Sequence, residues 1–276
     1  MSVELPRALV VTANNFNLVS GGGITLTNLF RGWPHDRLAN VHEDAVPEDH
    51  SVCRTFYRLT EEEIRWNWPF SLLQGWYGRK KQQAISTGGS APGPAGQGWL
   101  SAVKRLLGDG APKQARLTPA LLDWVEKFHP TLLYGFLGSL EQITLIRSLA
   151  ARFNIPMVVH MMDDWPAVLH RRGLLSPIMG PLIRSELACA LKEARGRLAI
   201  CDDMCTEYRD RYGYEFTAFQ NALDPAGWLP HARHQWQAGV PFVVRYVGSI
   251  LADGQQESLK DIALAVTGLR RAGRPI

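Results

Sequence analysis

Two adjacent aspartates, Asp163 and Asp164, end the apolar stretch IPMVVHMMDDWP, and His160 precedes them. A carboxylate at the end of a buried strand can orient a hydroxyl group or take its proton, and it can stabilise a developing positive charge. Because side chains alternate along a strand, Asp164 shares a face with His160 and Asp163 points to the opposite one. An aspartate here can instead cap the segment that follows, so we expect one of the two to have only a structural role.

Three consecutive glycines, Gly21, Gly22 and Gly23, open a segment in which apolar residues have helical spacing. They follow a short apolar run that we predict to be a buried strand. Glycine lets a backbone approach a ligand closely, and free amides at a helix start favour an anion. The alternative is a tight turn needed only for packing. The spacing is not G-x-G-x-x-G, and no acidic residue ends a second strand about 20 residues later, so we reject a nicotinamide-dependent oxidoreductase.

A basic and aromatic segment carries more than the whole excess of positive charge. The formal net charge is +4, yet residues 64–117 hold eight basic residues and one acidic residue. Tryptophan favours the headgroup layer of a membrane, and lysine and arginine attract anionic lipid. We therefore expect a membrane surface or an anionic acceptor to be contacted by Trp66, Trp68, Trp76, Arg79, Lys80 and Lys81. The alternatives are stacking of tryptophan on sugar rings, or core tryptophans beside an ordinary solvated edge.

Composition excludes several classes of protein. With 46% hydrophobic and 20% charged residues, the chain can bury a substantial core. No apolar stretch approaches the roughly 18 residues of a membrane span, and the first residues do not form a secretory signal. The four cysteines have no companions at zinc spacing, so we expect reduced thiols and no metal site. We expect a cytoplasmic protein, with any membrane contact peripheral and at the inner face, and no nucleic-acid partner.

The elements that must position these groups alternate between strand and helix. Apolar runs predict strands at residues 7–13, 51–59, 131–136, 155–166, 196–201 and 215–223. Apolar periodicity and helix-start signals predict helices at residues 23–33, 117–130, 139–154, 178–195 and 204–213, the last with Asp202 as its N-cap. This alternation indicates an α/β fold, in which a Rossmann-like parallel sheet is flanked by helices.

The pattern begins again near the end of the chain. A polar connector precedes a predicted strand at residues 242–250 and a predicted helix at residues 256–273. We therefore expect a domain at residues 1–225, a linker at residues 226–241 and an incomplete second Rossmann-like domain at residues 242–276. Within the first domain, residues 86–98 are rich in glycine, proline and serine, and we expect a flexible loop there.

Four stretches, taken together, resemble the GT-B glycosyltransferases of family 4, which are retaining enzymes that use nucleotide-sugar donors. In chain order they are SGGG, IPMVVHMMDDWP, AICDDMCTEYRDRYG leading to QNALD, and VRYVGSI. The resemblance covers nearly the whole chain, from the acceptor-side N-terminal domain to the start of the nucleotide-binding domain. Each motif alone is loose, and their order and spacing carry the resemblance.

The resemblance implies which residues meet the donor. Gly21, Gly22 and Gly23 stand where the family's loop approaches the diphosphate and sugar of the donor across the interdomain cleft. Gly248, in the expected first strand of the nucleotide-binding domain, is a further donor contact on the same grounds. Enzymes of this family generally need no divalent metal, so the resemblance implies a nucleotide-sugar substrate and no cofactor.

The resemblance also implies the catalytic candidates. The family commonly has a polar residue at the end of the middle strand, often histidine followed by aspartate, near the reacting sugar. This chain has an aspartate pair there instead, and we rank Asp163 first, Asp164 second and His160 third. Asn221 stands where the family crosses between domains, and we expect it in a hinge or turn.

The second domain lacks parts that the family uses. Arginine or lysine usually follows the VGSI motif and neutralises the donor phosphates, but Ser249 stands where arginine is frequent. The family's later pair of glutamates, which holds the ribose and sugar of the donor, does not occur before the chain ends. We therefore expect a fragment of a longer enzyme, or an incomplete enzyme, that is inactive alone.

The sequence thus predicts a glycosyltransferase that transfers a sugar, with retention, to a glycan, polysaccharide or lipid-linked acceptor. The alternative is a non-catalytic sugar-binding or scaffold protein derived from the same fold. The glycine loop and the acidic strand end favour the enzyme. The missing phosphate-binding bases and glutamates favour the alternative for this chain.

Overall fold

The computed structural model describes residues 4–66, 113–169, 175–221, 223, 225–233, 242–248, 250 and 255–274. The chain separates into two units, Met1–Leu223 and Asp224–Ile276, which we call unit 1 and unit 2. Unit 1 contains the sheet and the candidate site.

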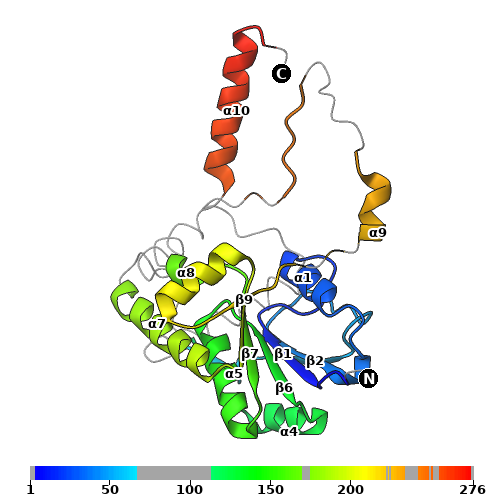
Figure 1. The fold of residues 1–276 in the computed structure, drawn as a ribbon, viewed down its shortest axis with the longest axis vertical. Helices are drawn as coiled ribbons and strands as arrows, with labels where there is room; N and C mark the ends of the chain where they lie inside the picture. The colour runs from blue at the N-terminus through cyan, green and yellow to red at the C-terminus, as the bar shows by residue number, and fades with distance from the viewer. Residues whose placement is uncertain are drawn as a thin grey trace. The chain divides into compact units, whose positions relative to one another are not determined.

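A seven-stranded parallel sheet forms the centre of unit 1, which confirms the predicted α/β fold (Figure 1). The strands are β1 Ala8–Thr12, β2 Leu38–His42, β3 Thr55–Arg58, β6 Leu132–Phe136, β7 Met157–Met161, β8 Gly196–Ala199 and β9 Thr217–Ala218. They lie side by side in the order β3-β2-β1-β6-β7-β8-β9. The strand order therefore changes direction between β1 and β6, which makes that point the topological switch point where open parallel sheets bind ligands.

Helices cover both faces of this sheet. Alternate residues of β1 point to opposite faces, so that Leu9 and Val11 belong to one apolar cluster while Ala8 and Val10 belong to another. The first cluster packs against α4 Pro119–Phe128, α5 Leu140–Phe153, α7 Ser176–Glu193 and α8 Asp202–Tyr212, and the second against α1 Gly21–Leu29. Because both faces are buried, β1 is a continuous apolar run instead of an alternating one.

One central strand, β2, was not predicted. Its sequence LANVH carries two polar residues, Asn40 and His42, and both side chains are buried. Asn40 Nδ2 donates a hydrogen bond to the carbonyl oxygen of Val10 at 3.1 Å, and His42 Nε2 lies 3.2 Å from a carboxylate oxygen of Glu48. These partners offset part of the cost of burying polar groups, and Oδ1 of Asn40 and Nδ1 of His42 have no partner among the described residues.

The helices begin one or two residues from their predicted starts, and two of these differences concern residues near the candidate site. α1 begins at Gly21 instead of Gly23, because Ser20 is its N-cap and the Ser20 hydroxyl accepts a hydrogen bond from the Gly23 amide at 3.2 Å. That capping bond offsets the low helix propensity of glycine. α8 begins at Asp202 itself, and Cys201 occupies the N-cap position that was predicted for Asp202.

The predicted membrane or acceptor segment lies almost wholly outside the described residues. The strands β4 Ile64–Trp66 and β5 Lys113–Ala115 form an antiparallel pair, and Trp66 is the last residue of β4. Residues 67–112 are not described, and they include Trp68, Trp76, Arg79, Lys80, Lys81 and the loop predicted at residues 86–98. Contact of this segment with a membrane or acceptor therefore stays a prediction.

Unit 2 contains α9 Pro225–Trp228, a 3-10 helix at Leu229–His231 and α10 Gln255–Arg271. The helix α10 confirms the one predicted at residues 256–273. The strand predicted at residues 242–250 is not observed, because its described residues pair with no other strand in the described part of unit 2. Across the described ranges, no helix is both long and apolar enough to cross a membrane.

Candidate functional site

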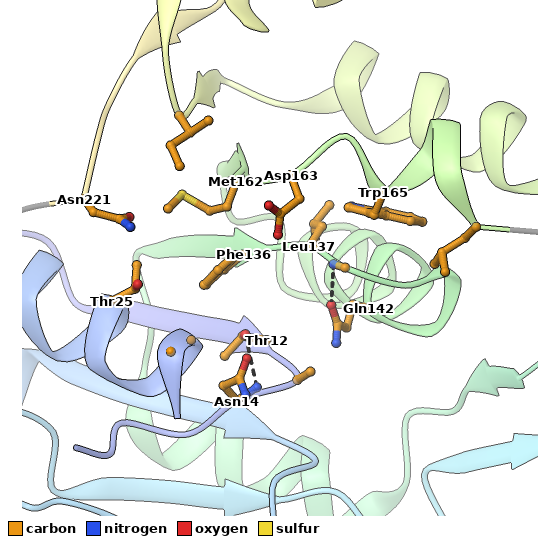
Figure 2. A pocket seen from close by; sticks show the side chains of 16 residues that line it. Thr12, Asn14, Thr25, Phe136, Leu137, Gln142, Met162, Asp163, Trp165 and Asn221 are labelled. Atoms are coloured by element: carbon orange, nitrogen blue, oxygen red, sulfur yellow. Dashed lines mark hydrogen bonds between the residues drawn. The ribbon is translucent and has the colours of Figure 1, made fainter. Parts of the chain in front are cut away.

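A cavity of about 460 Å³ lies at the carboxyl ends of β1, β6, β7 and β8, beside the switch point of the sheet (Figure 2). It is lined by Thr12, Ala13, Asn14, Gly21, Gly22, Thr25, Phe136, Leu137, Gly138, Gln142, Met162, Asp163, Trp165, Leu169, Ile200 and Asn221. All of these residues belong to unit 1. The cavity thus brings together two of the three consecutive glycines at residues 21–23 and one of the two adjacent aspartates.

The three glycines have different surroundings. A Cβ atom on Gly21 would meet nothing within 4 Å, whereas one on Gly22 would lie 2.3 Å from Oδ1 of Asn14. A Cβ atom on Gly23 would lie 2.2 Å from Nδ2 of Asn17, a side chain that is almost fully buried. Gly21 and Gly22 line the cavity and Gly23 does not. Packing therefore requires glycine at position 23, and position 21 alone is free of that requirement.

A network of buried amides fixes the loop between β1 and α1. The Oδ1 atom of Asn17 accepts hydrogen bonds from the amides of Val19 and Ser20, at 2.9 and 2.7 Å, and from the Ser20 hydroxyl at 3.1 Å. Its Nδ2 donates to Oδ1 of Asn15 at 2.7 Å, and Nδ2 of Asn15 donates to the carbonyl oxygen of Val46 at 2.6 Å. Because each amide is satisfied, the loop holds the start of α1 in one conformation.

Gly21 and Gly22, in the first turn of α1, line the cavity and have free amide groups. Ser20 caps the amide of Gly23, but the amides of Gly21 and Gly22 have no hydrogen-bond partner among the described residues. Unpaired amides at a helix start carry partial positive charge. An oxyanion or a hydroxyl oxygen of a ligand can accept hydrogen bonds from them.

Asp163 is exposed and faces the cavity. Figure 2 shows its carboxylate directed into the cavity from the end of β7. Its carboxylate has no hydrogen-bond or ion-pair partner among the described residues. It is the one acidic residue among those that line the cavity. Asp163 is therefore placed to accept a hydrogen bond, or a proton, from a bound ligand.

Asp164 turns away from the cavity toward α8. Its Oδ1 accepts hydrogen bonds from Nη1 of Arg211 at 2.7 Å and from the Tyr208 hydroxyl at 3.0 Å. Its Oδ2 accepts a second hydrogen bond from Arg211, through Nη2 at 3.1 Å. Asp164 is also the N-cap residue of α6 Trp165–Val168, yet its side chain makes no capping hydrogen bond. The adjacent aspartates thus have different surroundings, and only Asp163 lines the cavity.

His160 lies in the core and does not line the cavity. Its Nε2 lies 3.0 Å from the carbonyl oxygen of Phe219, and its Nδ1 contacts the hydroxyl of Tyr134. A carbonyl can only accept, so Nε2 carries the proton and Nδ1 accepts from Tyr134. Burial lowers the pKa of His160 to about 4, although the hydrogen bond to Phe219 opposes that shift. His160 is therefore a neutral histidine that joins β6, β7 and the segment after β9.

Several cavity residues were not predicted as ligand contacts. Trp165 and Phe136 supply aromatic surface, and Gln142 supplies an amide whose Oε1 accepts a hydrogen bond from Gly138 at 2.7 Å. Asn221, which was predicted in a hinge or turn, lies across the cavity from Trp165 in Figure 2. No motif marks these residues, because each reaches the cavity only through the packing of a separate element.

The remaining predicted donor contact, Gly248, belongs to unit 2. Its φ of 150° lies outside the range that residues with a side chain readily adopt. A Cβ atom there would lie 2.8 Å from the Tyr246 hydroxyl. Local conformation therefore requires glycine at this position.

The chain has no set of metal-ligating residues within the described part, where no group of three or more histidine, cysteine, aspartate or glutamate side chains could hold an ion. Comparison with models of known protein families gives no match, and a search of curated proteins gives none either.

Proposed function

We propose that unit 1 is the acceptor-side domain of a retaining glycosyltransferase that uses a nucleotide-sugar donor. The observation that carries this proposal is that Gly21, Gly22 and Asp163 line one cavity at the switch point of the sheet. Amides that favour an oxyanion and a carboxylate that accepts a proton are complementary to the two ends of a sugar-transfer reaction. Retention of configuration is expected from the family resemblance.

In this proposal the backbone amides, the carboxylate, the aromatic rings and the side-chain amides of the cavity bind different parts of the substrates. The amides of Gly21 and Gly22 bind an oxygen of the donor, and Asp163 orients or deprotonates the acceptor hydroxyl or stabilises an oxocarbenium-like centre. Trp165 and Phe136 offer apolar surface to a sugar ring. The amides of Gln142 and Asn221 offer hydrogen bonds to sugar hydroxyls.

A non-catalytic sugar-binding protein is the second candidate, and one observation favours it. Among the described residues that line the cavity there is no lysine, arginine or histidine to neutralise a diphosphate. A neutral sugar needs no such charge, because hydroxyl groups bind to amides, a carboxylate and aromatic faces. In that case the cavity binds a glycan without transferring it.

Replacing Asp163 by asparagine separates the two candidates. The full-length protein is incubated with a panel of nucleotide-sugars and candidate acceptors, and release of nucleoside diphosphate is followed. For the enzyme, we expect the Asp163→Asn substitution to lower turnover on the order of 100-fold or more, since positioned acid–base groups contribute that much. Binding of the donor should change little.

The matched control is Asp203→Asn, which removes an exposed carboxylate in the first turn of α8 that does not line the cavity. It should keep wild-type turnover. Glycan binding without turnover by any donor would favour the sugar-binding protein. Wild-type turnover in the Asp163→Asn variant would exclude the proposed role of this carboxylate.

A further inference from the structure

Asp164 stands between two residues that form the cavity wall. Asp163 and Trp165 both line the cavity, while Asp164 itself does not. Asp163 and Asp164 belong to the turn that joins β7 to α6, and Trp165 is the first residue of α6. Any change in the conformation of this turn therefore moves a carboxylate and an indole ring of the cavity together.

The carboxylate of Asp164 does not cap α6, although Asp164 is the N-cap residue of that helix. An aspartate at an N-cap position normally accepts a hydrogen bond from an amide in the first turn of its own helix. Asp164 makes no such bond with α6, and its carboxylate instead binds Arg211 and Tyr208 of α8. The turn is therefore held by α8, although the helix that follows it is α6.

The contact with α8 has a defined geometry. Arg211 binds both carboxylate oxygens, through Nη1 at 2.7 Å and Nη2 at 3.1 Å, which fixes orientation as well as distance. Tyr208 is fully buried, and Glu207 accepts a further hydrogen bond from Arg211 at 2.7 Å. The side chains of Arg211 and Asp164 are 28% and 36% exposed, and pairs this exposed add little stability. The pair therefore does more to orient the turn than to stabilise the fold.

We propose that Asp164 is a positioning residue, whose ion pair with Arg211 holds the turn so that Asp163 and Trp165 face the cavity. The inference rests on the proposed function, because it assigns the reacting carboxylate to Asp163. In it Asp164 acts through its two neighbours and does not touch the substrate.

The test uses substitutions that weaken the ion pair between Asp164 and Arg211 to different degrees. Arg211→Ala removes the contact, Arg211→Lys keeps the charge but loses the two-point geometry, and Asp164→Asn removes the other partner. Arg209→Ala is the matched control, since Arg209 is an exposed arginine of the same helix that contacts Asp210 instead of Asp164. The double variant Asp164→Asn with Arg211→Ala completes a cycle that measures the coupling of the pair.

Two measurements are made on each full-length variant. One is kcat and KM for the donor and acceptor identified in the panel described above. The other is the indole N–H resonance of Trp165, assigned with a Trp165→Phe variant, which needs no ligand. The Trp165 indole nitrogen is buried and has no hydrogen-bond partner among the described residues, so its resonance reports on the geometry of the wall.

We expect Arg211→Ala and Asp164→Asn each to lower kcat on the order of tenfold, with KM changed less than about twofold, because misplaced reacting groups affect turnover more than binding. Both should shift the Trp165 resonance, with Arg211→Lys intermediate and Arg209→Ala like the wild type. The double variant should be no slower than the worse single variant.

The proposal is overturned if Arg211→Ala has the kcat of Arg209→Ala, or if the Trp165 resonance does not move in either Arg211 variant. Absence of turnover in the wild-type protein with every donor would overturn the proposed function separately. The resonance then decides the positioning role by itself: a shift supports it and an unchanged resonance overturns it.

Discussion

Gly21 and Gly23 lie two positions apart in the first turn of α1, yet a methyl group would meet different surroundings at each. At position 23 it would contact the Asn17 carboxamide, which is held by several hydrogen bonds and cannot move aside cheaply. At position 21 it would project into open space beside the cavity. Packing therefore requires glycine at position 23, whereas position 21 leaves space beside the cavity for a ligand.

The Gly23→Ala variant should lose about 2–3 kcal/mol of unfolding free energy, as expected when a methyl group is forced into a packed site. The Gly21→Ala variant should keep its stability or gain about 0.5–1 kcal/mol, because alanine has the higher helix propensity. Urea unfolding measures both. Equal losses in the two variants would contradict the different surroundings of these glycines.

The Gly21→Ala variant also tests whether a ligand approaches the backbone of α1. A methyl group at position 21 would keep a ligand from approaching the backbone closely. Gly21→Ala should therefore weaken binding of a nucleoside diphosphate about tenfold or more, an expectation that depends on the proposed function. Calorimetric titration measures this, and unchanged affinity would show that the ligand does not approach the first turn of α1.

At the scale of elements, the buried His160 makes the free energy of unfolding depend on pH. Burial holds its pKa at about 4, below the ordinary value of 6.5, so the folded state favours the neutral ring. The unfolded chain takes up a proton first as the pH falls. The contribution of the neutral His160 to the free energy of unfolding is therefore complete above pH 6.5 and declines between pH 6.5 and 4. It amounts to about 3 kcal/mol by linkage.

The His160→Gln variant should show a flatter dependence of unfolding free energy on pH between 6.5 and 4 than the wild type. The buried His42, whose pKa is also lowered by burial against the opposing effect of Glu48, remains in both proteins and cancels from the comparison. His231→Gln, which changes an exposed histidine of unit 2, is the control and should follow the wild type. Parallel curves for wild type and His160→Gln would contradict the assigned neutral state.

Glu63 joins the turn before β4 to the start of α4. Its carboxylate accepts hydrogen bonds from the hydroxyls of Tyr57, Thr60 and Thr118, at 3.1, 2.6 and 2.7 Å, and from the amide of Thr60 at 2.9 Å. Burial alone would raise the pKa of Glu63, but these hydrogen bonds outweigh it and lower the pKa. Thr118 is also the N-cap of α4, as the sequence predicted. One buried carboxylate therefore links two elements.

The Glu63→Gln variant should lose about 1–3 kcal/mol of unfolding free energy at pH 7, because an amide presents hydrogen atoms to donors that need an acceptor. The loss should shrink as the pH falls through the range where Glu63 itself takes up a proton. Glu62→Gln, at an exposed neighbouring carboxylate, is the control. Chemical unfolding at several pH values measures the difference, and equal stabilities of the two variants at pH 7 would contradict it.

How far the sequence predicts these elements depends on how each is buried. β1, β6 and β7 are apolar runs because both of their faces are covered, and they were predicted. β2 was missed because Asn40 and His42 are buried with partners that only the folded chain supplies. No local pattern carries that information.

The candidate site shows the same division. The glycines and the aspartates were selected from their positions next to predicted strands together with the family resemblance. That Asp163 faces the cavity and Asp164 faces α8 depends on Arg211, which lies 47 residues further along the chain. Gln142 and Asn221 likewise reach the cavity from elements that the chain brings together only on folding.

At the scale of the whole molecule, the candidate cavity belongs to one unit. Every residue that lines it lies before residue 224, where unit 2 begins. Unit 1 also contains both apolar clusters of buried residues. We therefore expect unit 1 to fold and to form the cavity without any residue of unit 2.

A chain ending at Leu223 should consequently unfold at the same temperature as unit 1 of the full chain. A chain ending at Ala218 should not, because it lacks Phe219, whose carbonyl oxygen accepts the hydrogen bond from His160 and whose ring packs against the imidazole. Loss of that buried hydrogen bond and ring contact costs about 2 kcal/mol, which lowers the melting temperature by roughly 4–8 °C for a domain of this size. Circular dichroism melts of the two truncated chains measure the difference. Equal melting temperatures would show that the segment after β9 does not hold His160, and a large loss already in the chain ending at Leu223 would show that unit 1 depends on unit 2.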